Sequence, residues 1–233
     1  MKQVIFVVGA ILASSKALFI TPRDLIDDAT KQLEELKSIV QGQILVAHSD
    51  LQQVQQDFQT YGANSAESAA VNIQQEKDTI DSQLQTIKDL AHSAGKDVSA
   101  CTDIRETVLD RLPRSYVDEM NRHIAGLISE VGTILSDARY IVDISINKVH
   151  SLEHQLEKCK GDILCISPLI TEIQMNKIRL PQNIKTEVQA AESLADTLKV
   201  SVNDASEQNV AQYTSEASSI LGDITACVNR IIG

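Results

Sequence analysis

The chain has 233 residues, a formal net charge of −11, only 3% aromatic residues and no tryptophan. The acidic excess repels phosphate groups, which argues against a nucleic acid partner and against anionic membrane surfaces. So few aromatic side chains cannot fill a bulky globular core, whereas the many Leu, Ile, Val and Ala residues suit thin helix–helix interfaces.

Residues 1–17 have the pattern of a secretory signal peptide. Met1-Lys2 is basic, residues 4–12 are apolar, and Ser15-Lys16-Ala17 places small residues around a cleavage site after Ala17. The apolar run is shorter than the roughly 20 residues that a membrane-spanning helix needs, and charged residues interrupt every later apolar segment. We therefore predict a secreted, extracellular protein with no stable membrane insertion; cleavage would leave 19 basic against 32 acidic residues, a net charge of −13.

The next segment predicts a helical hairpin over residues 18–95. Thr21-Pro22 offers an N-cap followed by proline at the first helical position. Apolar residues then recur with the mean spacing of 3.5 that is typical of coiled coils: Ile26, Ala29, Leu33, Leu36, Val40, Ile44, Ala47, Leu51, Val54, Phe58 and Tyr61. Gly62-Ala63-Asn64-Ser65 predicts the end of this helix and the cap of a second, antiparallel helix that ends at Gly95.

Residues 96–233 predict a longer helical hairpin that contains all four cysteines. A helix over 97–112 precedes Pro113, and a helical pattern of some 45 residues follows from Ser115 to Cys159. Lys160-Gly161-Asp162 predicts the turn, and Ser167-Pro168 the cap of a return helix that Pro181 interrupts. The sequence leaves open whether Pro113 and Pro181 break or only kink their helices. The whole pattern predicts an all-α fold of elongated antiparallel helices.

The four cysteines are spaced almost symmetrically about that turn. Fifty-seven residues separate Cys101 from Cys159, and 61 separate Cys165 from Cys227. On one straight helix Cys101 and Cys159 would lie about 87 Å apart, too far for a disulfide. The hairpin therefore favours Cys101–Cys227 with Cys159–Cys165, and pairing Cys101 with Cys165 becomes feasible only if the chain folds back at Pro113. An even cysteine count in an exported chain favours disulfides over free thiols.

One motif points to a metal, and we interpret it as a helix surface. His150-Ser-Leu-Glu153-His154 matches the H-x-x-E-H pattern of inverted zincins. The apolar positions Val149, Leu152 and Leu156 face the helix interface, so both histidines are expected to point outward, where no dry cavity could hold a catalytic zinc. Lys77, the one charge among the interface positions of its helix, is expected at an edge with its ammonium in water. We therefore expect no catalytic residue, no metal site and no cofactor, and no enzymatic activity; the sequence leaves open adventitious binding of zinc or nickel by His150 and His154.

Residues 97–233 resemble the TsetseEP-domain family of insect secreted proteins. The resemblance depends on Cys101, Lys158-Cys159, Cys165 and the tail Ile224-Thr225-Ala226-Cys227, together with the signal peptide and the helical sequence. It implies secretion, in some members into the gut, and a domain whose biochemical activity is undefined. The founding member also carries a Glu-Pro repeat tail that this sequence lacks, so no role of that tail is implied here.

Three functional hypotheses follow from the sequence. The first is a non-enzymatic secreted helical protein that acts through its surface on an extracellular macromolecule, a protein or a glycan, or in an extracellular layer; the sequence leaves open whether it forms a homo-oligomer. The second is a carrier of lipid or another small apolar ligand, because amphipathic helices that separate at loops and prolines expose apolar surface. The third, a zinc peptidase, depends only on His150, Glu153 and His154.

Overall fold

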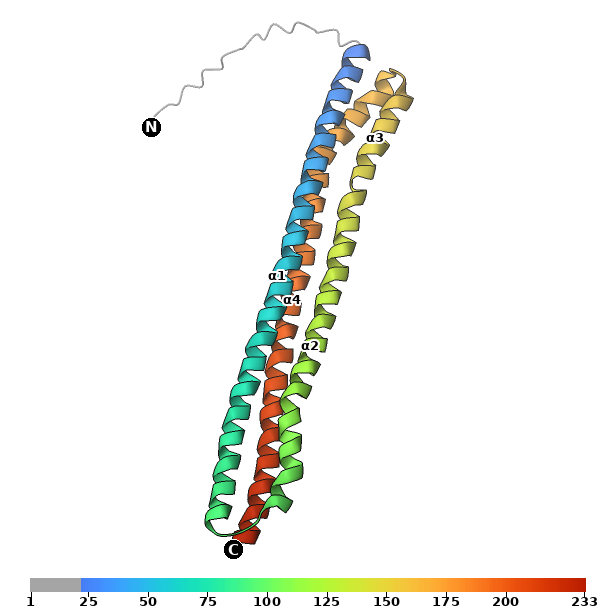
Figure 1. Cartoon of the computed structure of the whole chain (residues 1–233). Helices are drawn as coiled ribbons and strands as arrows, with labels where there is room; N and C mark the ends of the chain where they lie inside the picture. The colour runs from blue at the N-terminus through green and yellow to red at the C-terminus, as the bar shows by residue number, and fades with distance from the viewer. Residues whose placement is uncertain (1–21) are drawn as a thin grey trace, which may run out of the picture.

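The computed structural model describes residues 22–233, which form four α-helices and no strand. They are α1 (Pro22–Ser93), α2 (Ser99–Ile144), α3 (Ile146–Cys159) and α4 (Ile163–Ile232). Helix α3 continues the direction of α2, so the chain forms three long rods in which α1 and α4 run the same way and α2–α3 runs against both (Figure 1). The all-α prediction is confirmed. The predicted signal peptide and its cleavage site lie outside the described residues.

The predicted hairpin over residues 18–95 is wrong, because α1 is one uninterrupted helix of 72 residues. At 1.5 Å per residue it is about 108 Å long. Gly62 does not end the helix: a Cβ at this position would lie 3.1 Å from Cγ2 of Ile124, so the glycine allows α2 to approach. Ser65 does not cap a second helix either, because its Oγ lies 2.8 Å from Oγ of Ser206 on α4. Both residues serve packing between helices.

The prolines interrupt neither long helix. Pro113 lies within α2, and Pro168 and Pro181 lie within α4. Leu109 and Leu112 are buried just before Pro113, so packing offsets the backbone hydrogen bond that a proline removes. A separate helix over 97–112 was therefore a wrong prediction.

Two other helix boundaries differ from those predicted. The rod expected from Ser115 to Cys159 is divided at Ser145, whose hydroxyl donates to the carbonyl of Ile141, a bond that tends to bend helices. Helix α4 begins before Ser167-Pro168, and its N-cap is Asp162, whose side chain accepts a hydrogen bond from the backbone N–H of Leu164.

Both disulfides have the pairing that the hairpin favours. Cys101 at the start of α2 is bonded to Cys227 near the end of α4, with the Cα atoms 5.8 Å apart. Cys159 at the end of α3 is bonded to Cys165 at the start of α4, with the Cα atoms 5.5 Å apart. We call α2, α3 and α4, joined by these bonds at both ends, the closed hairpin.

The core is a narrow line of side chains between the rods and consists of two apolar clusters. The larger cluster takes residues from all four helices and reaches from Ala29 of α1 to Val202 of α4. The smaller one lies at the end of the bundle with the α1–α2 loop and surrounds Tyr213. The rings of Tyr213 and Tyr116 meet edge to face, with their centroids 6.0 Å apart. Because α1 contributes to both clusters, residues 22–233 form one bundle.

Candidate binding surfaces

The two histidines of the H-x-x-E-H motif lie on the outer side of α3, as predicted. His150 and His154 are exposed, and their Nδ1 atoms lie 2.8 and 3.6 Å from carboxylate oxygens of Glu153 and Glu157. Glu153 also accepts a hydrogen bond of 2.8 Å from Nζ of Lys37 on α1, which together with the bond to His150 holds its pKa below the usual value. Within residues 22–233, no three histidine, cysteine, aspartate or glutamate side chains are placed to share a metal ion. The motif here joins α3 to α1.

Lys77 lies between α1 and α2 with its side chain 20% exposed. Its ammonium contacts Asp81 one turn along α1 and lies 3.3 Å from Asp110 of α2. The hydrogen bond to Asp81 raises the pKa of Lys77, while burial acts in the opposite direction. The lysine is thus a paired charge at the edge of the interface.

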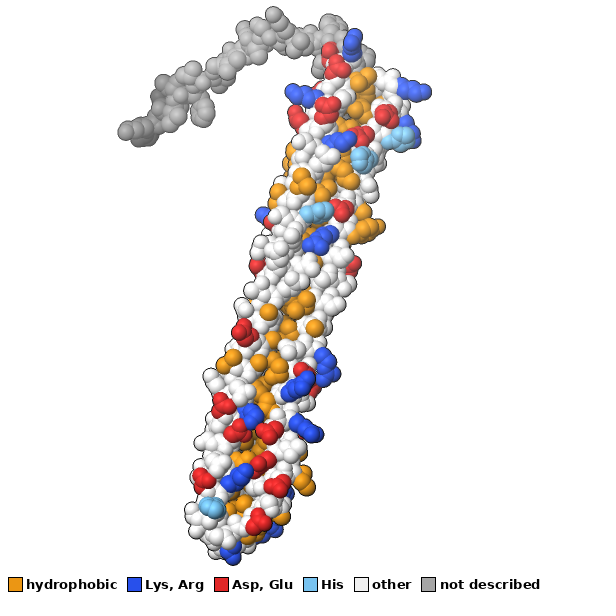
Figure 2. Space-filling model, viewed as in Figure 1, with side chains coloured by type: hydrophobic (Ala, Val, Ile, Leu, Met, Phe, Trp, Pro, Cys, Tyr) orange, Lys and Arg blue, Asp and Glu red, His pale blue; other side chains and the backbone are white. Residues whose placement is uncertain are grey.

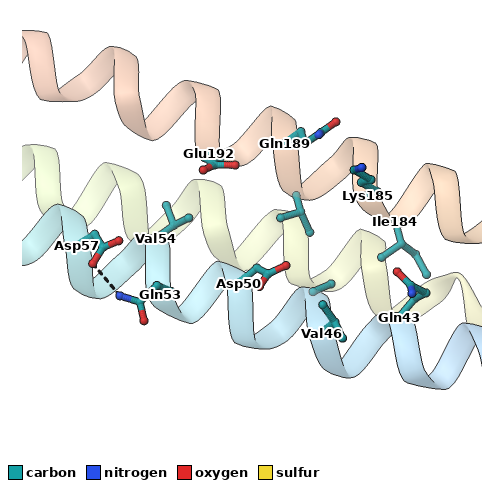
Figure 3. A pocket seen from close by; sticks show the side chains of 12 residues that line it. Gln43, Val46, Asp50, Gln53, Val54, Asp57, Ile184, Lys185, Gln189 and Glu192 are labelled. Carbon is teal, nitrogen blue, oxygen red and sulfur yellow. Dashed lines mark hydrogen bonds between the residues drawn. The ribbon is translucent and has the colours of Figure 1, made fainter.

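A shallow groove of about 500 Å³ runs between α1 and α4 (Figure 3). We call it the α1–α4 groove; it is lined by Gln43, Val46, Ala47, Asp50, Gln53, Val54 and Asp57 of α1 and by Ile184, Lys185, Val188, Gln189 and Glu192 of α4. Its apolar residues come from both helices, and three carboxylates lie along it against one lysine. Figure 3 shows Asp50 and Glu192 on opposite sides of the space between the helices. The groove therefore suits a partner segment that is basic and partly apolar.

A second hollow of about 600 Å³ lies at the opposite end of the rod from the α1–α2 loop. We call it the tip cavity; it is lined by Ile26, Thr30, Leu33 and Glu34 of α1, by Glu153, Leu156 and Glu157 of α3, and by Lys160 and Gly161 of the turn. Gly161 has φ +88°, a conformation that favours glycine, and a Cβ there would lie 3.5 Å from Cδ1 of Ile26. The tight turn thus lies against the apolar side chain of Ile26 in the lining of this open hollow.

Polar side chains of α1 and α4 lie near the point where the two apolar clusters meet, and we call them the polar layer: Tyr61, Ser65, Asn203, Ser206 and Asn209. Tyr61 donates to Oδ1 of Asn203 at 2.7 Å, and Ser65 is hydrogen-bonded to Ser206. Asn209 is 8% exposed; its amide donates to the carbonyl of Ala205, and its Oδ1 has no partner. The sequence shows the α4 part of this layer as a polar interruption of the apolar pattern, but it gives no sign that the interruption faces α1.

Comparison with known proteins identifies no relative, since neither a family model nor a curated protein matches the chain. None of the helices in residues 22–233 has both the length and the apolar character that crossing a membrane requires.

Proposed function

We propose that this is a secreted, non-enzymatic helical protein that acts by binding an extracellular macromolecule along its side. The observation that carries the proposal is the α1–α4 groove on a rod whose α2–α4 part is covalently closed at both ends. The disulfides hold α4, one wall of the groove, against α2 and α3, while apolar packing holds α1, the other wall. The full pairing of four cysteines supports an oxidising location.

The charge of the groove favours a protein partner with a basic, partly apolar segment. Asp50, Asp57 and Glu192 would face lysine or arginine side chains of such a segment, while Val54 and Val188 would contact its apolar side chains. Complementary charge raises the rate and the specificity of association. A net charge of −11 works against a polyanionic partner, which makes a sulfated glycan a poor candidate.

Cross-linking mass spectrometry in the fluid from which the protein is purified tests this proposal. Cross-links to one partner are expected to cluster at Lys185 of the groove, and the triple variant Asp50→Asn, Asp57→Asn, Glu192→Gln is expected to lose that partner. The matched control replaces three exposed acidic residues of α2, Glu119, Glu130 and Asp137, with their amides and removes the same charge. Equal loss with both variants would show that net charge, and not the groove, determines binding.

A second candidate function, carriage of a lipid or another small apolar ligand, is favoured by the tip cavity. Its apolar residues Ile26, Leu33 and Leu156 come from helices that no covalent bond holds together at that end. Native mass spectrometry of protein purified from its source tests this function directly: bound lipid supports it, and protein that carries no small molecule counts against it.

A further inference from the structure

Helix α1 differs from the other helices in how it is attached. It contains no cysteine, so neither disulfide holds it, and within residues 22–233 its one covalent connection to the other helices is the loop of residues 94–98. In that loop Gly95 has φ +65°, and the N–H of Lys96 bonds to the carbonyl of Ala91. Cys101 follows almost at once and anchors the start of α2 to α4. Movement of α1 away from the closed hairpin therefore requires backbone changes in those five residues only.

Ion pairs, and not disulfides, join the side chains of α1 to those of the closed hairpin. Five lysine–carboxylate ion pairs join different helices within residues 22–233, and four involve α1: Lys37–Glu153, Lys77–Asp110, Lys88–Glu106 and Glu35–Lys177, the fifth being Lys148–Glu172. Nε2 of His48 on α1 also lies 2.8 Å from a carboxylate oxygen of Asp143 on α2. The side chains in these contacts are 20–70% exposed, and exposed pairs of this kind contribute little to stability. In the middle of the rod, two hydrogen bonds of the polar layer join α1 to α4 in addition to the apolar contacts of the clusters.

Apolar burial is what keeps α1 in place in water. Leu36, Val40, Leu51 and Phe58 of α1 are fully buried against the closed hairpin. Release of α1 would expose these side chains along a helix of about 108 Å, so the released state is rare unless another apolar surface replaces the hairpin. Figure 2 shows hydrophobic side chains along the boundary between α1 and α2–α3, with charged side chains beside them. An apolar stripe with polar flanks is the pattern by which amphipathic helices lie in a lipid interface.

We propose that α1 is released as a unit from the closed hairpin and that the uncovered apolar surfaces bind a zwitterionic phospholipid interface. This inference depends on the second candidate function, carriage of lipid, and adds the ligand class and the moving element. The lipid is zwitterionic because a net charge of −11 is repelled by an anionic surface. The disulfides at both ends of the closed hairpin stay intact throughout, so α1 returns to its original position on the hairpin when lipid is lost.

A new disulfide between α1 and α4 tests the release. Oγ of Ser65 and Oγ of Ser206 lie 2.8 Å apart, so the variant Ser65→Cys, Ser206→Cys needs only a small shift to form a bond that holds α1 on α4. The control Ser65→Ala, Ser206→Ala removes the same hydrogen bond without a covalent link. Both proteins are compared with the unaltered chain in co-flotation with phosphatidylcholine vesicles, after circular dichroism has shown equal helix content.

The unaltered chain and the alanine control are expected to float with the vesicles, and the oxidised cysteine variant to bind at least tenfold less. Equal binding by the cysteine variant would overturn release of α1 while leaving lipid carriage intact, whereas no binding by any of the three would refute both. A covalent dimer of the cysteine variant would assign the released α1 to a second copy of the chain and overturn the lipid proposal.

Hydrogen exchange of the unaltered chain gives a second measurement that requires no variant. Amides of α1 are expected to exchange faster than those of α4 without lipid, because α1 is released while the hairpin stays closed. Equal protection of the two helices would show that they open together and would overturn release of α1 as a unit.

Discussion

The two disulfides should contribute unequally to stability, because they close loops of very different length. Cys101 and Cys227 are 126 residues apart in sequence, and Cys159 and Cys165 only 6. In the chain-entropy model the longer loop gives the folded state about 5 kcal/mol and the shorter about 2.4 kcal/mol. Replacing the first pair by alanine should therefore lower the free energy of unfolding by about 2.5 kcal/mol more than replacing the second.

Urea denaturation followed by circular dichroism measures both losses. The two double variants form a matched pair, since each replaces two cysteines by alanine, and one cysteine of each pair is buried, Cys101 and Cys159. Both variants should still fold into the same helices, because α1 packs on the hairpin in each. Equal losses, or a larger loss for the short loop, would refute the view that the outer disulfide acts by restricting the unfolded chain.

Three further predictions follow from individual side chains. Gly42→Ala should stabilise the protein by about 1 kcal/mol, because a Cβ at this position meets nothing within 4 Å. Gly62→Ala should stabilise the protein less, or destabilise it, because its Cβ would press on Ile124 of α2. Urea denaturation that ranks the two variants in the opposite order would contradict the packing role of Gly62. Lys177 lowers the pKa of the Glu35 carboxyl below 4.5. The stabilisation from this pair should therefore be present above pH 4.5 and be lost as the pH falls through the lowered pKa, so the melting temperature of Glu35→Gln should depend less on acid than that of the unaltered chain. An equal or greater dependence in Glu35→Gln would argue against this. The hydrogen bond to Glu216 raises the pKa of Tyr116 from 10.0 to about 12. The stabilisation from this hydrogen bond should therefore be present below pH 10 and be lost as the pH rises towards 12. In an ultraviolet titration of Glu216→Gln, Tyr116 should ionise at a lower pH than in the unaltered chain, and an unchanged titration would disprove the assignment.

The sequence predicted the disulfide pairing and the helical class because both follow from regular geometry. Cysteines at matched distances from a turn come together in any straight hairpin, and an apolar spacing of 3.5 residues predicts helices whatever they pack against. The outward positions of His150 and His154 were predicted for the same reason, since Val149 and Leu152 define the buried side of α3.

The hairpin at residues 62–65 was mispredicted because one residue type serves two purposes. Glycine ends helices, but Gly62 is needed where Ile124 of α2 comes close. Serine caps helices, but Ser65 is bonded to Ser206, which is 141 residues away in sequence. Neither contact can be read from local sequence, because both depend on which helix lies opposite. The α1–α4 groove was missed for the same reason.

The continuity of α1 is the claim on which the groove, the polar layer and the release of α1 all depend. Spin labels on Gly42→Cys and Ser82→Cys test it, since both positions are exposed and the four native cysteines are already paired. In one straight helix the two sites lie about 60 Å apart, and pulsed electron resonance should find a single distance near that value. A reversal at Gly62 would bring the labels to within about 15 Å of each other, and that short distance would contradict the account.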